Sequence, residues 1–271
     1  MTSDQYASGG VSACRFNRAI VRAPAPSAVD GLRAGDGPAP DFAGLRREFE
    51  AYLRALRDNG VGVDILPPLE EHPDSIFVED AALVFPEAAI VLRPGAPSRR
   101  GEAGAIVDAL RARFAQVAEL PVGSVDGGDV LTTKETVFIG LSSRTDREGA
   151  DALSKLLAEL GRKALIVETP PGVLHFKSDC GLIDDETVLA TERLAETGAF
   201  DDFSVVLTPD GEEAAANVIA INGTVLLSDG FPKTAELLSR KGFRVALSPT
   251  REISKLDAGL SCMSLRWRAP D

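Results

Sequence analysis

Cysteine is the side chain best suited to nucleophilic chemistry in this sequence, because no G-x-S-x-G nucleophile elbow is present. Of the three cysteines, Cys14 lies at the edge of a polar N-terminal stretch, and Cys180 lies in the segment "HFKSDCGLI". Strand alternation in that segment places His175 and Cys180 on opposite faces, which predicts that Cys180 is buried in the core. Cys262 enters a predicted strand, "GLSCMSLRW", through Gly259, and it is our candidate nucleophile.

A cysteine nucleophile needs help at neutral pH, because the thiolate is the reactive form and an ordinary thiol has a pKa near 8.5. A cationic substrate held by carboxylates would favour the thiolate when it binds. His175, Asp126, Glu79 and Asp80 lie near the start of successive repeats, as Cys262 does in the last one. This combination indicates a guanidinium-like substrate. The structural alternatives are a hydrogen-bonded core histidine and carboxylates paired with structural arginines.

The composition argues against several other functions. The formal net charge of −12 and the pI near 4.8 would repel nucleic acids and anionic membrane surfaces. No segment has the roughly 20 apolar residues that cross a bilayer, and the first residues show no signal-peptide pattern. An odd number of widely spaced cysteines favours a reducing compartment, so we expect a cytoplasmic chain. With two histidines and no CxxC or HxxxH motif, we expect no resident metal.

The elements that must position these residues follow a repeated order of strand, strand, helix and strand, at a period of roughly 40–50 residues. Successive repeats begin at "IFVEDAALVF", "DGGDVLTT", "LHFKSDCGLI" and "AANVIAI", with helices predicted, for example, over 102–114 and 147–161. The segment "GLSCMSLRW" opens a fifth repeat, which the strand 16–24, the helix 41–60 and the strand 61–68 would complete. In that segment Met263, Leu265 and Trp267 are predicted to share a packing face.

This pattern predicts an α/β fold, a closed and pseudo-symmetric five-bladed propeller of ββαβ units in which equivalent positions converge on the axis. The alternative is an ordinary α/β sheet with accidental spacing, and a Rossmann sheet would require a G-x-G-x-x-G that is absent. We expect residues 1–13 to be a disordered tail and residues 14–271 to form one catalytic domain.

Several motifs in one collinear order resemble those of a known family. The segments "HPDSIFVEDAAL", "RPGAPSRRGE", "VDGGDVL", "FIGLSSRT", "VLHFKS" and "LDAGLSCMSL" are similar to those of the dimethylarginine dimethylaminohydrolases, which belong to the guanidine-modifying superfamily of five-bladed α/β propellers. The resemblance runs from about Phe16 to the end of the sequence. It implies hydrolysis of Nω-methylated arginines to citrulline and methylamine or dimethylamine, without a cofactor and through a covalent thiouronium.

The resemblance also implies roles for individual residues. Cys262 matches the family's nucleophile, His175 its general acid and base, and Asp80 with Glu79 the carboxylates that hold the substrate guanidinium. Asp126 matches a carboxylate that orients the histidine or the guanidinium, at a position where some family members have Glu. Further substrate contacts are implied at Arg99 and Arg144 for the carboxylate, Asp74 for the α-amino group, Leu32 on a lid, and Leu256 before the nucleophile.

Other functions remain open on the sequence alone. An arginine deiminase or an amidinotransferase would use the same propeller, although those relatives resemble longer chains with insertions. A catalytically silent methylarginine-binding or scaffold protein could use its thiol as a redox sensor. The sequence also leaves open a homodimer and the capture of inhibitory zinc by a pocket of Cys, His and carboxylates.

Overall fold

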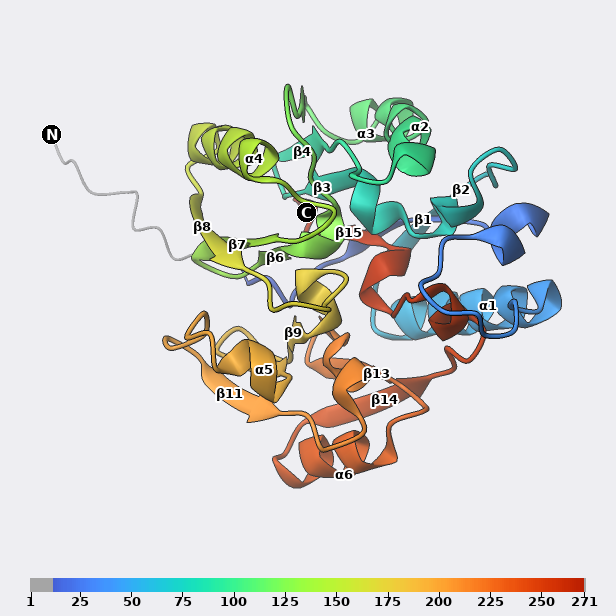
Figure 1. The fold of residues 1–271 in the computed structure, drawn as a ribbon, viewed down its shortest axis with the longest axis vertical. Coiled ribbons are helices and arrows are strands. Elements are labelled where there is room, and N and C mark those ends of the chain that lie inside the picture. Colours follow the sequence, from blue (N-terminus) through green and yellow to red (C-terminus); the bar gives the residue numbers. More distant parts are fainter. Residues whose placement is uncertain (1–11, 271) are drawn as a thin grey trace, which may run out of the picture.

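The computed structural model of the protein describes residues 12–270 and shows five three-stranded sheets arranged in a ring (Figure 1). The sheets are β15-β1-β2, β3-β4-β5, β6-β7-β8, β9-β10-β11 and β12-β13-β14. Their strands are β1 (Arg18–Arg22), β2 (Gly62–Leu66), β3 (Ala82–Val84), β4 (Ala88–Val91), β5 (Gln116–Glu119), β6 (Val130–Thr132), β7 (Thr136–Leu141), β8 (Lys163–Glu168), β9 (Cys180–Leu182), β10 (Thr187–Ala190), β11 (Ser204–Leu207), β12 (Ile219–Ile221), β13 (Thr224–Ser228), β14 (Arg244–Ser248) and β15 (Leu265–Trp267). The predicted five-bladed α/β propeller is confirmed.

Every sheet has the same pairing. Its first and second strands are antiparallel, and its second and third strands are parallel. A parallel pair requires a crossover connection, and a helical segment supplies it in each sheet. The helices are α1 (Phe42–Asp58), α2 (Arg100–Gly104), α3 (Val107–Arg111), α4 (Arg147–Glu159), α5 (Glu192–Ala195) and α6 (Pro232–Arg240), and Figure 1 shows α4 and α6 at the periphery of the ring.

The two longest helices begin at N-cap aspartates. Asp41 accepts a hydrogen bond from the Gly44 N–H at 2.7 Å before α1, and Asp146 accepts one from the Gly149 N–H at 2.7 Å before α4. Each bond satisfies one of the free N–H groups of a first helical turn. The apolar side chains of each helix then pack onto its sheet, which is why the periodicity of these two segments predicted their positions well.

The single helix predicted over 102–114 is wrong. The structure has two short helices there, α2 and α3, separated at Ala105 and Ile106. Gly104 weakens the helix at this point, and the Ala105 carbonyl accepts a hydrogen bond from the buried Arg22 guanidinium at 3.4 Å.

The ring closes between segments from opposite ends of the sequence, because β1 pairs with β15 in one antiparallel ladder. The expected tail, residues 1–13, falls mainly outside the described residues. Its last two residues are described, and the Ser12 hydroxyl and the Ala13 N–H both donate to Asp185, at 2.8 and 3.1 Å.

The repeats do not begin with long strands, which corrects the sequence prediction. Each begins with a 3₁₀ helix, followed by a first strand of only three residues. The 3₁₀ helices of neighbouring repeats contact one another, so the starts of the repeats converge as predicted. They are Val78–Ala81, Gly127–Asp129, Phe176–Ser178, Glu213–Ala216 and Ser261–Met263.

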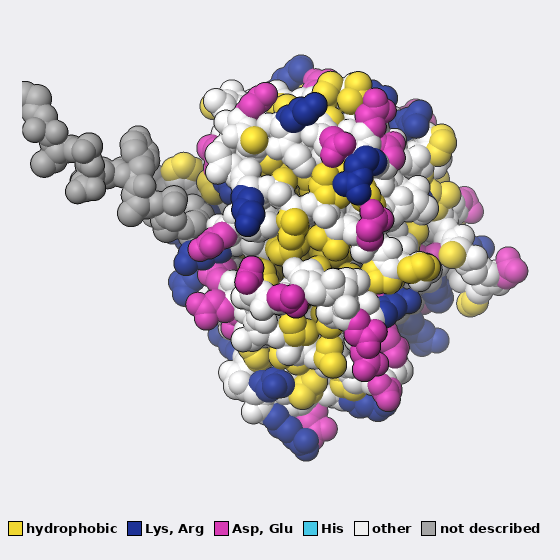
Figure 2. Space-filling model, turned by 60° about the vertical axis from the view of Figure 1, so that its left-hand side comes forward, with side chains coloured by type: hydrophobic (Ala, Val, Ile, Leu, Met, Phe, Trp, Pro, Cys, Tyr) yellow, Lys and Arg dark blue, Asp and Glu magenta, His cyan; other side chains and the backbone are white. Residues whose placement is uncertain are grey.

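Acidic and basic side chains are interspersed over the face shown in Figure 2, with hydrophobic side chains between them. This face therefore presents no continuous basic surface within the described part of the chain.

Candidate active site

One pocket of about 160 Å³ collects most of the predicted site residues. Loops and 3₁₀ helices from distant parts of the sequence form its walls, which is the convergence that the repeat pattern predicted. Of the predicted residues, those that line it are Leu32, Asp74, Asp80, Arg99, Arg144, His175, Leu256 and Cys262. Glu79 and Asp126 are not among the pocket-lining residues.

Cys262 lies in the 3₁₀ helix Ser261–Met263 and not in a strand, as the sequence pattern had suggested. Asn217 holds this turn, because its Oδ1 accepts from the Ser261 N–H at 2.9 Å and its Nδ2 lies 4.0 Å from the Cys262 sulfur. A side chain at Gly259 would place its Cβ 2.4 Å from Asn217, so the close approach requires glycine.

The residues after Cys262 pack as expected, but not on one strand face. Met263 belongs to the 3₁₀ helix and is buried in the core beside α1. Leu265 and Trp267 lie on β15 and pack in a different cluster, where the Trp267 ring lies 5.0 Å from that of Phe114.

The environment of Cys262 favours the thiol. Burial, together with the negative charges of Glu79 and Asp80, raises its pKa to about 12, although the Gly259 N–H and Lys177 act in the opposite direction. At neutral pH Cys262 is therefore a thiol in this arrangement. A cation bound beside the sulfur would offset the negative charges of Glu79 and Asp80 and so lower the pKa of the thiol.

His175 precedes the 3₁₀ helix Phe176–Ser178, so the strand alternation predicted for this segment is wrong. The conclusion drawn for Cys180 is nevertheless confirmed. Cys180 is buried in the core, and its sulfur lies 3.3 Å from the Phe176 carbonyl. Cys14 is also buried, and burial with the nearby Asp185 raises its thiol pKa.

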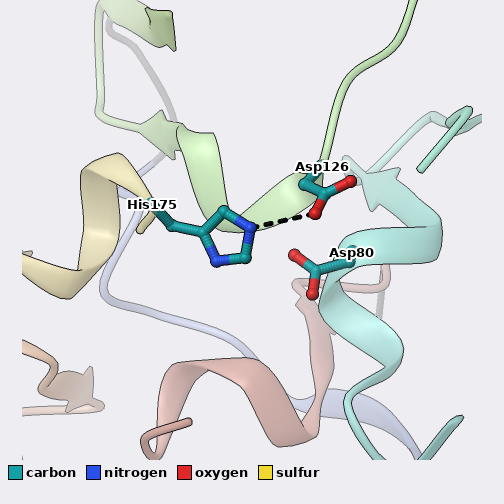
Figure 3. Close-up of side chains that lie close together, drawn as sticks. All are labelled: Asp80, Asp126 and His175. Carbon is teal, nitrogen blue, oxygen red and sulfur yellow. Dashed lines mark hydrogen bonds and ion pairs between the residues drawn. The ribbon is translucent and has the colours of Figure 1, made fainter. Parts of the chain in front are cut away.

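Two carboxylates face the imidazole of His175 (Figure 3). Its Nε2 lies 2.9 Å from Oδ2 of Asp126, which is fully buried. Burial alone would lower the pKa of His175, but the charge of Asp80, the hydrogen bond to Asp126 and the charge of Asp129 outweigh burial and raise it to about 9. His175 is therefore a protonated acid at neutral pH in this arrangement.

Close packing at Gly128 supports this geometry. A Cβ at that position would lie 2.7 Å from Nδ1 of His175 and 3.0 Å from Oδ1 of Asp80. The Gly128 N–H also donates to Asp80 Oδ1 at 2.7 Å. The motif "VDGGDV" thus lets the backbone approach both side chains.

Arg99 has more partners than the sequence indicated. Its guanidinium is buried, forms an ion pair with Asp80, and contacts Glu102 at 2.7 Å. Burial would raise the pKa of Asp80, but Arg99, His175 and the Gly128 N–H lower it to about 2. The residues predicted to hold opposite ends of a substrate are therefore paired with each other in this structure.

Glu79 points elsewhere than predicted. Its carboxylate pairs with Lys177 at 2.7 Å and Arg266 at 3.2 Å, and it accepts from the Ser261 hydroxyl at 2.9 Å. It lines a second cavity of about 160 Å³, together with Lys177 and Trp267. This geometry does not support Glu79 as a direct ligand of a guanidinium in the first pocket.

The remaining predicted residues, Leu32, Asp74, Arg144 and Leu256, line the same pocket with different degrees of exposure. The Leu32 N–H donates to Asp74 Oδ1 at 2.9 Å, and the residue Leu32 is 39% exposed. Burial raises the pKa of Asp74, against the opposing effect of Arg99. The Arg144 side chain is 21% exposed, and its NH1 lies 4.0 Å from Asp126 Oδ2.

Asp80, Asp126 and His175 place three potential metal-ligand atoms within 4.8 Å of one another. Two carboxylates and one imidazole would suit a divalent cation. In this structure, however, the His175 Nε2 and both Asp80 oxygens already have hydrogen-bond partners.

Sequence reasoning missed several supporting residues. Asp129 is fully buried behind His175, Lys177 pairs with Glu79, and Asn217 holds the cysteine turn. The second aspartate of "VDGGDV" could have been noticed, because an acidic residue beside a predicted buried strand needs partners. No local signal marked Asn217, whose contact is 44 residues away in the chain.

Comparison with known proteins identifies the class and then the family. The fold is that of the five-bladed α/β propellers to which the dimethylarginine dimethylaminohydrolases belong. The structure of "DDAH from Pseudomonas aeruginosa", a Cys-to-Ser mutant complexed with citrulline, matches with a TM-score of 0.90 and 37% identity, over 93% of this chain and 99% of that chain.

Two relatives named N(G),N(G)-dimethylarginine dimethylaminohydrolase agree with this class. The protein from Pseudomonas aeruginosa is 38% identical over 93% of this chain and 100% of its own length, and the one from Streptomyces coelicolor is 34% identical over 93% and 97%. Residues 43–169 match the family model "N,N dimethylarginine dimethylhydrolase, eukaryotic". The chain belongs to the dimethylarginine dimethylaminohydrolase family. Within residues 12–270, none of the helices combines the length and apolar character that crossing a membrane requires.

Proposed function

We propose that this chain hydrolyses Nω-methylated arginines, such as asymmetric dimethylarginine and monomethylarginine, to L-citrulline and dimethylamine or methylamine. The observation that carries the proposal is a thiol with a pKa raised to about 12 in one pocket with a buried carboxylate and a histidine whose pKa is raised to about 9. Such a thiol becomes reactive only when a cation binds beside the sulfur and lowers its pKa. Asp80, in the same pocket, can form an ion pair with that cation. Membership of the family supports the same substrate class.

In the first half-reaction, the substrate guanidinium replaces Arg99 as the partner of Asp80 and lowers the pKa of the Cys262 thiol, which releases its proton to solvent. The thiolate then forms a bond to the guanidinium carbon. The bond from that carbon to the methylated nitrogen breaks, and His175 gives its proton to the departing amine. A covalent thiouronium remains on Cys262.

In the second half-reaction, His175 accepts a proton from a water molecule that attacks the thiouronium carbon. When the tetrahedral adduct collapses, the bond from carbon to sulfur breaks, the proton of the adduct's hydroxyl is released to solvent, and citrulline leaves. Cys262 returns as a thiolate or, after taking up a proton, as a thiol. The hydrogen bond to Asp126 keeps the imidazole oriented through both proton transfers.

Arg144 is the stronger candidate for binding the substrate carboxylate, because its side chain is partly exposed in the pocket whereas Arg99 is buried among carboxylates. A planar guanidinium suits a carboxylate through paired hydrogen bonds. Asp74, a buried carboxylate that lines the same pocket, would accept a hydrogen bond from the α-amino group. Leu32 and Leu256 would cover the aliphatic part of the substrate.

The test is citrulline formation from asymmetric dimethylarginine by the wild type and by the variants Cys262→Ser and His175→Ala. Both variants should lose at least about 10³-fold in kcat/KM, as nucleophile and general acid substitutions do. Cys14→Ser, which changes another buried thiol, should retain the activity. Wild-type turnover in either site variant would refute the assignment.

A parallel assay with arginine separates this proposal from an arginine deiminase. Ammonia released from arginine with a higher kcat/KM than the amine from methylated arginines would overturn the choice of substrate. We also propose a cytoplasmic location, because all three cysteines are free thiols and the nucleophile must stay reduced.

A further inference from the structure

Two consecutive repeats contain the same buried contact. Asp129 immediately precedes β6 and Asp179 immediately precedes β9, and both side chains are almost fully buried. Each accepts a hydrogen bond at 2.7 Å from a threonine hydroxyl that follows the second strand of its sheet, Thr145 in one repeat and Thr191 in the next. The contact therefore belongs to the repeat architecture.

The further partners of the two carboxylates differ. Asp179 pairs with Arg193, whose side chain is 49% exposed, at 2.8 Å. Asp129 instead accepts from the Ser142 hydroxyl at 2.6 Å and from the Phe176 N–H at 2.8 Å. Neither set of partners lines the first pocket itself, so the two carboxylates differ in the groups that their partners hold in turn.

Each side-chain or backbone group that donates to the Asp129 carboxylate is either hydrogen-bonded to a residue of the candidate active site or adjacent to one in the sequence. Phe176 follows His175 in the chain, so its N–H fixes the turn that carries the imidazole. The Thr145 hydroxyl accepts from the Asp126 N–H at 3.1 Å. The Ser142 hydroxyl accepts from the Arg144 N–H at 3.0 Å.

We propose that Asp129 is a positioning residue for the reaction: one buried carboxylate fixes the backbones of His175, Asp126 and Arg144 relative to one another. This inference rests on the proposed function and deepens it. The contact is shared with the next repeat, but only around Asp129 do its hydrogen-bond partners hold the backbones of Asp126 and Arg144 and of Phe176, which follows His175.

Charge supports the same role. Asp129 is among the carboxylates that raise the pKa of His175, and burial raises its own pKa to about 6. It is therefore ionised at neutral pH and helps to keep His175 protonated. Loss of the charge should lower the pKa of His175, whereas loss of an ordinary core contact should leave that pKa unchanged.

The experiment compares Asp129→Asn with its matched control in the next repeat, Asp179→Asn. Both changes preserve shape and remove one buried charge. For Asp129→Asn we expect kcat/KM for asymmetric dimethylarginine to fall by about 10-fold to 100-fold, the cost of a small misplacement of reacting groups. Asp179→Asn should stay within about 2-fold of the wild type, even where thermal unfolding shows that it is destabilised to the same extent.

The threonines provide a second matched pair. Thr145→Val removes the acceptor of the Asp126 N–H and should lower kcat, whereas Thr145→Ser keeps the hydroxyl and should restore it. Thr191→Val makes the same change in the next repeat and should leave kcat near the wild-type value. Ser142→Ala acts on the Arg144 branch and should mainly raise KM.

A readout without turnover separates this inference from the proposed function. The chain contains two histidines, so NMR titration of the His175 imidazole, assigned with His175→Ala, can be followed in each variant. The pKa of His175 should fall in Asp129→Asn and stay at its wild-type value in Asp179→Asn. If the wild type hydrolyses no methylarginine, the proposed function fails. The titration would still show whether Asp129 acts on His175 as a positioning residue. Equal His175 titrations in both variants, or equal losses of kcat/KM, would overturn the inference.

Discussion

Replacing Asp126 by Asn should shift the alkaline limb of the pH–rate profile. In the proposed mechanism His175 is the general acid and must be protonated when the substrate binds, so kcat/KM should fall as the pH rises through its pKa of about 9. Asp126→Asn keeps the shape but turns a charge-assisted hydrogen bond of 2.9 Å into a neutral one. The two kinds of bond differ by about 1–1.5 kcal/mol, which corresponds to about one pKa unit. The limb should therefore move from about 9 to about 8.

The assay is citrulline formation at low concentrations of asymmetric dimethylarginine across pH 6 to 10, which reports kcat/KM of the free enzyme. Asp126→Glu is the matched control, because it retains the charge and should keep the limb near its wild-type position despite a lower rate from altered geometry. A limb that stays in place in Asp126→Asn, or that moves equally in both variants, would refute the idea that the charge-assisted bond to Asp126 helps to raise the pKa of His175.

Three further outcomes follow from the packing and charges of the site. Gly128→Ala should lower kcat/KM by about 100-fold, because its Cβ would lie 2.7 Å from the His175 ring, whereas Gly104→Ala, with no atom within 4 Å, should have no effect. Lys177→Met should lower the free energy of unfolding by about 3 kcal/mol in urea titrations, because it removes a cation from the buried Glu79; the double variant with Glu79→Gln should recover part of that loss. Dialysis against EDTA should leave citrulline formation unchanged, since the proposed steps need only protein groups; a loss of activity restored by a divalent cation would contradict them.

The ring and the pocket could be predicted from the sequence because both follow from regularities along the chain. The repeated order of strands and helices predicted the sheets, and the capped amphipathic segments predicted α1 and α4 closely. Because Cys262 and His175 lie near the starts of repeats, the repeat pattern predicted that they share one cavity. In the structure both residues line the same pocket.

The direction of individual side chains could not be predicted in the same way. A strand at 78–81 would have turned Glu79 and Asp80 to opposite faces, but a 3₁₀ helix occupies these residues. Glu79 finds Lys177 and Arg266 as partners, and Asp80 finds Arg99. These ion pairs depend on which lysine and arginine side chains of other segments lie nearby in the folded chain. Hydrophobic periodicity predicts strands and helices but not such long-range contacts.

Closure of the ring also has a consequence for folding. Cys262, the proposed nucleophile, lies three residues before β15, and β15 completes its sheet by pairing with β1 from the opposite end of the sequence. Contacts between such distant segments carry a large entropic cost of loop closure and form slowly. The other four sheets can therefore form before the 3₁₀ helix that contains Cys262 is fixed in position by the pairing of β15 with β1. During refolding from denaturant, activity should return only with this last pairing, and later than the recovery of secondary structure.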